Sequence, residues 1–355
     1  MKVSDFDFEL PNELIASHPL EHRDASRMLV FDSKISDKHI VDFISYLRPG
    51  DVVVFNNSKV IPARFNATAN DGTKYEITLH TKTNDGWLGF AKKFQKLKIG
   101  EKLKLDNNTE IEILSKSDES GLSIKFYSDD VFSVLDKVGK MPLPPYMKRK
   151  EEISDRERYQ TIYANPLGSM AAPTAGLHFT NELLNAVRKA GASIVNITLH
   201  VGAGTWAPIK VQDTDNHKMH SEWGVITQEQ ADVINQAKKN GGRIIAIGTT
   251  SLRLLESAAI CPHQSLLATA PSPLGGQVII APFCGTTDIF ITPGYKFKVV
   301  DVLLTNFHLP KSTLFILVSA FAGLSEMQAV YKHAIVEKYR FFSYGDCCLL
   351  FKKAK

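Results

Sequence analysis

Residues 62–121 read PARFNATANDGTKYEITLHTKTNDGWLGFAKKFQKLKIGEKLKLDNNTEIEILSKSDESG. Short runs rich in β-branched and aromatic residues alternate here with turn sequences. The turn sequences are Asn70-Asp71-Gly72, Asn84-Asp85-Gly86, Asp106-Asn107-Asn108 and Ser120-Gly121. Because such turns join antiparallel strands into hairpins, the stretch predicts a small antiparallel sheet or barrel. We assign residues 62–155 to this β insert.

The sequence on either side of the insert is typical of an α/β layer, in which apolar strands alternate with amphipathic helices. The expected strands are Asp51–Phe55, Ser193–Val201, Arg243–Ile247, Asp288–Ile291 and Val299–Leu304. The expected helices are Asn181–Ala190, Thr227–Lys239 with Thr227 as its cap, Leu252–Ala259 and Ser325–Lys338. The sequence therefore predicts a discontinuous α/β catalytic domain, 1–61 plus 156–355, with a small β-barrel domain inserted at 62–155.

Composition is that of a folded protein, because 44% of the 355 residues are hydrophobic and 23% are charged. The N-terminal residues MKVSDFDFELP lack the apolar stretch of a secretory signal. The longest apolar run, Leu314–Leu324, is too short to cross a bilayer. The four cysteines show no CxxC pairing, which argues against a disulfide framework or a zinc ribbon. We expect a cytoplasmic protein with reduced thiols and no membrane partner.

Lysine and arginine are clustered, although the net charge is only +4. One cluster lies in AKKFQKLKIGEKLK (91–104) and another in KMPLPPYMKRK (140–150). Each cluster is either a solvated face or a surface that binds phosphate groups, and composition alone leaves both readings open.

Two glycine-containing segments outside the insert are candidates for ligand binding. In APTAGLHF (172–179), Gly176 permits close approach of a ligand and His178 could transfer protons; the alternative is a tight turn with a packed histidine. In HVGAGTWAP (200–208), the third glycine of a dinucleotide-binding loop is absent, so a Rossmann fold is excluded. The backbone there could still reach a small molecule, with Trp206 stacking on a base, unless it is a bend with a core Trp.

Three further segments carry polar groups beside apolar ones. HKMHSE (217–222) has histidines at metal-ligand spacing, but acid/base chemistry or hydrogen bonding is favoured over a metal. IGTTSLR (247–253) could hold a carboxylate or phosphate on Thr249–Ser251 and Arg253, or its hydroxyls could simply cap a helix. Asp301, Asn306 and His308 must be satisfied internally or serve a site.

Read together, these segments resemble the S-adenosylmethionine:tRNA ribosyltransferase-isomerase (QueA) family of queuosine biosynthesis. The resemblance rests on blocks in both ends and the middle of the chain. These are RPGDVVVFNNSKVIPARF (48–65), MPLPPYMKR (141–149), YQTIYA (159–164), AAPTAGLHFT (171–180), HVGAGTWAPI (200–209), HKMHSE (217–222), IGTTSLRLLES (247–257), the stretch 288–323, and YRFFSYGD (339–346). The insert matches only loosely between 67 and 140.

The resemblance implies a barrel-like α/β domain with a small β-barrel, and a reaction that needs no metal or redox cofactor. The ribosyl part of S-adenosylmethionine is transferred and isomerised onto 7-aminomethyl-7-deazaguanine at the tRNA wobble position, giving epoxyqueuosine, adenine and methionine. S-adenosylmethionine and tRNA are the expected partners, and we expect a monomer. The alternatives are an S-adenosylmethionine-dependent RNA methyltransferase and an RNA-binding protein without activity.

Residue chemistry then assigns expected roles. The expected catalytic residues are His178, His308, His220 and Glu222, with His200 behind them. The expected S-adenosylmethionine ligands are Thr174, Gly176, Gly202, Gly204, Thr205, Thr249, Thr250, Ser251, Arg253 and Tyr344. The expected tRNA-binding residues are Lys59, Arg64, Lys92, Lys93, Lys96, Lys98, Lys148 and Arg149. No metal-binding residue is expected.

Overall fold

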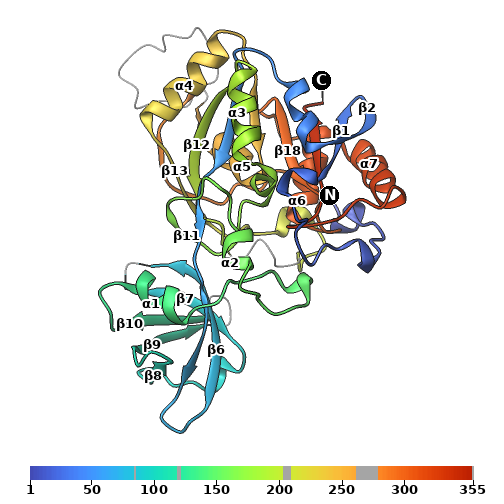
Figure 1. Ribbon diagram of the computed structural model, residues 1–355. Helices are drawn as coiled ribbons and strands as arrows, with labels where there is room; N and C mark the ends of the chain where they lie inside the picture. The colour runs from blue at the N-terminus through green and yellow to red at the C-terminus, as the bar shows by residue number, and fades with distance from the viewer. Residues whose placement is uncertain (84, 118–120, 203–208, 261–278, 354–355) are drawn as a thin grey trace.

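A computed structural model describes residues 1–83, 85–117, 121–202, 209–260 and 279–353. It shows two lobes, a large one that contains both described ends of the chain and a smaller one below it (Figure 1). A nine-stranded sheet forms the large lobe and a closed antiparallel barrel forms the small one. This confirms the α/β fold class with an inserted β-barrel.

The nine-stranded sheet places parallel strands at its centre. Its order is β17 (Phe283–Thr287), β13 (Glu222–Ile226), β12 (Ser193–Leu199), β3 (Val52–Asn56), β14 (Ile244–Ile247), β18 (Val302–Asn306), β19 (Cys347–Phe351), β1 (Arg27–Asp32) and β2 (Lys34–His39). Strands β12, β3, β14 and β18 run parallel to one another. Their carboxyl ends therefore meet at one edge of the sheet, the usual place for a ligand in such folds.

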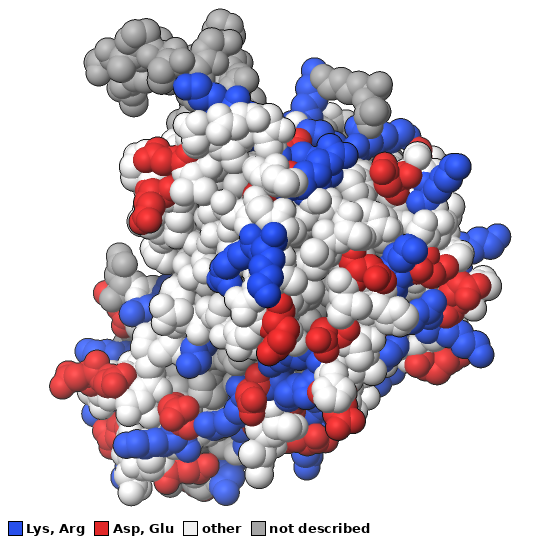
Figure 2. Space-filling view, turned by 45° about the horizontal axis from the view of Figure 1, so that its top comes forward, with Lys and Arg blue, Asp and Glu red and all other residues white. Residues whose placement is uncertain are grey.

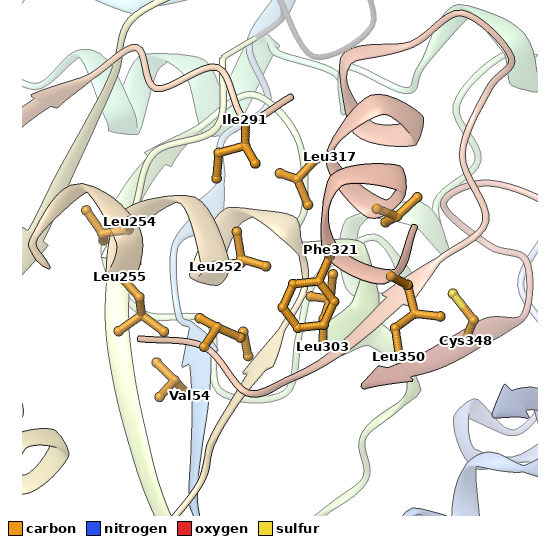
Figure 3. Close-up of a cluster of buried hydrophobic side chains, with 14 of the residues drawn as sticks. Val54, Leu252, Leu254, Leu255, Ile291, Leu303, Leu317, Phe321, Cys348 and Leu350 are labelled. Carbon is orange, nitrogen blue, oxygen red and sulfur yellow. The ribbon is translucent and has the colours of Figure 1, made fainter. Parts of the chain in front are cut away.

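Helices cover both faces of the sheet because its strands are apolar on both faces. They are α3 (Asn181–Lys189), α4 (Gln228–Lys239), α5 (Thr249–Ser257), α6 (Thr313–Ala322) and α7 (Leu324–Val336). Helix α3 packs with one set of strand side chains, and α4 to α7 pack with the other set. Figure 3 shows part of this second cluster, in which Leu252 and Leu255 of α5 and Phe321 of α6 meet Val54 and Leu303 of the strands.

Most elements expected in the α/β part are present, with small shifts at their ends. Helix α4 begins after Thr227, whose hydroxyl accepts a hydrogen bond from Gln230 N at 3.3 Å, as expected. The expectation that hydroxyls cap α5 is wrong, because α5 begins at Thr249 and its cap is Gly248. Gly248 has φ 87°, in the left-handed region that glycine adopts without strain.

The expected strand Asp288–Ile291 is also wrong. The strand at this place is β17, which ends at Thr287 and pairs antiparallel with β13. The apolar character of the following residues has another cause, because Ile291 is buried and Ile289 and Phe290 pack on the main hydrophobic core without joining a ladder. Periodicity cannot distinguish a short buried strand from a buried loop.

The barrel is formed by one continuous stretch of the insert. Its order is β10 (Gly121–Phe126), β7 (Trp87–Ala91), β6 (Lys74–Lys82), β5 (Arg64–Thr68), β8 (Lys102–Leu105) and β9 (Glu110–Ser117). A helix not expected from the sequence, α1 (Val131–Val138), buries Val134 and Leu135 against the barrel. Since the barrel has a hydrophobic cluster of its own, we propose that 62–155 and the rest of the chain are the two domains.

The shorter strands and helices include α2 (Asp155–Arg158), β4 (Lys59–Val60), β11 (Leu167–Ser169), β15 (Ala259–Ile260) and β16 (Ile279–Ile280). Several 3-10 turns are also present, among them Thr174–His178. Within the described ranges, no single helix is long and apolar enough to span a membrane. Helices α6 and α7 reach that length only as a pair, and they are bent by 114° between them.

Candidate active site

A pocket lies where two parallel strands of the sheet end. Strand β14 continues into Gly248, Thr249 and Thr250, and β18 continues through Asn306 into His308, and all of these residues line the pocket. The opposite wall comes from the 171–175 segment, which includes Thr174. This position at the carboxyl ends of parallel strands is typical of binding sites in α/β folds.

A second, smaller pocket borders the first through Ser343, which lines both. It contains His178, Tyr344 and the guanidinium groups of Arg23 and Arg158. The two pockets are thus neighbours. Of the sequence-predicted site residues, His308, Thr174, Thr249 and Thr250 line the first, and His178 and Tyr344 line the second.

Hydrogen bonds fix the tautomer of His178 between the two pockets. Ser26 Oγ donates to Arg23 O at 3.3 Å, so the 2.9 Å contact between Ser26 Oγ and His178 Nδ1 has the ring nitrogen as donor. On the other side, Asn306 Nδ2 donates to His178 Nε2 at 3.3 Å. His178 Nε2 therefore carries the lone pair and faces Asn306, a residue that lines the first pocket.

Both buried histidines are neutral near pH 7. Burial lowers the pKa of His178 to about 4, and the positive charges of Arg23 and Arg340 add to this shift. Burial lowers the pKa of His308 to about 3, and its Nε2 lies 3.1 Å from Thr305 Oγ1. A neutral imidazole can accept a proton, and once protonated in such surroundings it is a strong acid.

These pKa values predict that acid destabilises the fold. In the unfolded chain each histidine takes up a proton near pH 6.5, whereas in the folded chain His178 and His308 stay neutral down to about pH 4 and 3. The unfolded state therefore binds more protons, and at pH 5 each histidine should lower the free energy of unfolding by about 2 kcal/mol relative to pH 7.5.

Urea unfolding at pH 7.5 and pH 5.0 measures this loss. His308→Gln, which cannot titrate, should lose less stability between the two pH values than the unchanged chain. An equal loss in both proteins would show that His308 does not carry the effect.

Glu222 and Arg253 form a buried ion pair away from the lining of both pockets. Arg253 Nη1 donates to Glu222 Oε2 at 2.5 Å, and both side chains are almost fully buried. The other carboxylate oxygen, Oε1, accepts a hydrogen bond from Gly202 N at 3.0 Å. The pair therefore fixes the start of the glycine segment after β12, and the geometry indicates a positioning function for both residues.

The remaining predicted residues lie in varied places. Ser251 is buried and its hydroxyl donates to Ile247 O at 2.9 Å. Gly176 is buried, and a side chain there would collide with Tyr163 Oη. His220 is exposed, and no group of metal ligands forms among the residues that the structure describes. Gly204 and Thr205, with Trp206, lie outside the described residues. His200 stacks on Trp223 with ring centres 5.4 Å apart.

Several predicted tRNA-binding residues share one groove. Arg64, Lys92, Lys148 and Arg149 line the space between barrel strands and the 143–150 segment. Arg149 also forms a two-point ion pair with Asp155 at 2.7 Å. Elsewhere, Lys59 lies in a separate groove. The exposed residues Lys93, Lys96 and Lys98 do not line either one.

Surface charge outside the groove is mixed. Figure 2 shows Lys and Arg side chains interspersed with Asp and Glu over one face, with neither sign gathered into one large patch. The groove between the barrel and the 143–150 segment has five basic residues and one acidic residue among its described lining residues, a larger basic excess than the net charge of +4 for the whole chain indicates.

Sequence reasoning missed some residues that line the pockets. Tyr146 and Ser343 line the first pocket, and their hydroxyls are 2.5 Å apart. Both belong to the quoted blocks 141–149 and 339–346, so a polar residue inside such a block was a usable signal. Ser26, Arg23 and Arg158 line the second pocket without such a signal, because only the fold brings them to His178.

A family model described as queuosine biosynthesis protein matches residues 3–350. The chain belongs to this family. It is 47% identical to the S-adenosylmethionine:tRNA ribosyltransferase-isomerase of Parvibaculum lavamentivorans, with 99% of each chain covered. It is 49% identical to the protein of the same name from Rickettsia bellii, covering 99% of this chain and 100% of that one.

A solved relative agrees with this membership of the queuosine biosynthesis protein family. The crystal structure of S-adenosylmethionine tRNA ribosyltransferase from Thermotoga maritima matches with a TM-score of 0.53 and 33% sequence identity. The match covers 98% of this chain and 99% of that chain. It therefore extends over both lobes.

Proposed function

We propose that this chain is an S-adenosylmethionine:tRNA ribosyltransferase-isomerase. It transfers and isomerises the ribosyl part of S-adenosylmethionine onto 7-aminomethyl-7-deazaguanine at the tRNA wobble position, and it releases adenine and methionine. Full-length similarity to curated relatives of that name carries the proposal. The pocket at the ends of β14 and β18, with a neutral buried histidine in its wall, supports it.

The first pocket is the proposed S-adenosylmethionine site. Thr174, Thr249 and Thr250 supply hydroxyl and backbone groups there, and the aromatic ring of Tyr146 supplies a face for the sulfonium. S-adenosylmethionine is a substrate in this proposal, and no further cofactor is part of it. The ion pair Glu222–Arg253 lies outside the pocket lining and holds Gly202, the residue that follows Val201 of the pocket wall.

The chemistry needs a base and then an acid. The sulfonium acidifies the neighbouring ribose methylene, so a neutral imidazole can remove a proton from that carbon. As the bond between ribose and adenine breaks, the leaving adenine needs a proton. His308 lines the pocket and is neutral at rest, so it can accept the proton in the first step. Its low pKa makes it a strong acid once protonated, which favours the return of the proton to adenine. His178 holds Asn306 in place from the second pocket.

Product analysis tests the function. The protein is mixed with S-adenosylmethionine and tRNA that carries the aminomethyl-deazaguanine base, and the products are analysed by mass. Adenine and methionine should form in step with a heavier wobble base. S-adenosylhomocysteine would instead indicate methyl transfer, and tight tRNA binding without products would indicate a binding protein.

A further inference from the structure

One ring of an aromatic pair lines the cationic groove between the barrel and the 143–150 segment. The rings of Phe90 on β7 and His80 on β6 are stacked, with centres 4.3 Å apart and an interplanar angle of 23°. Phe90 lines the groove and is 45% exposed. In the β6–β7 ladder, Phe90 pairs with Thr78, which also lines the groove. The side chain of Phe90 therefore lies on the outside of the barrel, and neither Phe90 nor His80 belongs to the hydrophobic cluster inside it.

The walls beside this pair favour an anionic polymer. Arg64, Lys92, Lys148 and Lys150 line the groove, and Glu76 is the one acidic residue among its described lining residues. The charge of the fifth basic residue, Arg149, is compensated by Asp155. An exposed aromatic face flanked by cationic side chains is the arrangement that binds single-stranded nucleic acid, because phosphates meet the cations while a base stacks on the ring.

The groove and the proposed S-adenosylmethionine site draw lining residues from the same segment of the chain. Pro145 lines the groove, whereas the next residue, Tyr146, lines the first pocket and packs its ring on Phe342 at 4.5 Å. One short segment thus forms a wall of both.

We propose that Phe90, stacked on His80, is the stacking platform for an unpaired base of the tRNA anticodon loop. The proposal rests on the function proposed above, which makes a tRNA wobble nucleotide the acceptor. It adds a base-contacting residue on the barrel and gives the insert a direct part in holding the unpaired loop. Sequence-independent stacking of this kind positions the loop without reading its sequence.

Fluorescence of 2-aminopurine tests the platform without relying on catalysis. The probe is an unmodified anticodon stem-loop RNA with 2-aminopurine placed in turn at each unpaired loop position. Stacking on Phe90 should quench the signal at one of these positions when the full-length protein binds. Phe90→Ala should remove this quenching and weaken binding about tenfold.

Three variants make the result specific. Phe90→Trp should keep the quenching, because it keeps an aromatic face, and Phe90→Leu should lose it while retaining apolar bulk. Ile99→Ala removes another exposed apolar side chain of the barrel, 65% exposed and outside the groove lining, and should bind as the unchanged protein does.

Equal quenching and affinity in Phe90→Ala and the unchanged protein would overturn the platform. If the unchanged protein still released adenine from S-adenosylmethionine with tRNA, only the stacking proposal would be contradicted, and the proposed function would stand. If the unchanged protein quenched the probe but released no adenine, the proposed function would fail while the RNA contact stood.

Discussion

Adenine release by His308→Ala is expected to be about 10²- to 10⁴-fold slower than by the unchanged protein at pH 7. His308 follows β18 directly, lines the first pocket and is neutral because burial lowers its pKa to about 3. Alanine leaves the shape of the backbone but no group that can take the ribose proton and return it to adenine. Single-turnover formation of adenine, measured by chromatography with saturating S-adenosylmethionine, gives the rate.

The matched control is His39→Ala, which removes an exposed histidine from the same lobe and should leave the rate unchanged. Affinity for tRNA should be nearly the same in all three proteins, since the groove is built from other residues. A His308→Ala variant that releases adenine at the original rate would contradict the assignment. The proton would then have to be taken by another group, and His178 would be tested next.

Of the substitutions proposed for stability, removal of one partner of the ion pair Glu222–Arg253 should lower the free energy of unfolding most. Glu222→Leu leaves the guanidinium of Arg253 buried without its carboxylate, and breaking a buried pair in this way costs about 3–5 kcal/mol. The hydrogen bond from Gly202 N is lost at the same time. Urea unfolding at pH 7.5 measures the free energy of unfolding.

Two further variants separate the charge from the packing. The double variant Glu222→Leu with Arg253→Met removes both charges and should regain much of the lost stability, since a buried pair can be replaced by apolar groups. Lys238→Ala breaks a partly exposed pair with Asp301 at 2.9 Å and should cost less than about 1 kcal/mol. If Glu222→Leu were no more costly than Lys238→Ala, the buried pair would not be a major contribution to stability.

Local sequence signals were enough to predict the barrel, in which strand-like runs and turn sequences alternate repeatedly. The turn residues at 70–72 and 106–108 predict hairpins, and those hairpins form the barrel. Local sequence signals were not enough at Ile289–Ile291, where buried residues of a loop have the apolar pattern of a strand. They also did not predict helix α1, which packs on the barrel. An apolar side chain indicates that a residue is buried, but it does not indicate which other residues pack against it.

The candidate site was only partly predictable for the same reason. His308 and Thr249 lie beside their own strands, so strand ends alone predict that they meet. Glu222 and Arg253 were expected at the reaction centre from their chemistry, and their mutual pairing depends on packing between β13 and α5. Such a contact joins residues that are far apart in the chain, so their spacing in the sequence does not predict it.

The order of strands in the large sheet also has a consequence for synthesis on the ribosome. Strand β3 ends at Asn56, but its neighbours β12 and β14 begin at Ser193 and Ile244. All barrel strands lie between, at 64–126. Domains fold as units in the order in which they emerge from the ribosome. The barrel can therefore form before the two strands that pair with β3 have been synthesised. The barrel is therefore complete first, and β3, an interior strand of the large sheet, stays unpaired until more than half of the chain has been made.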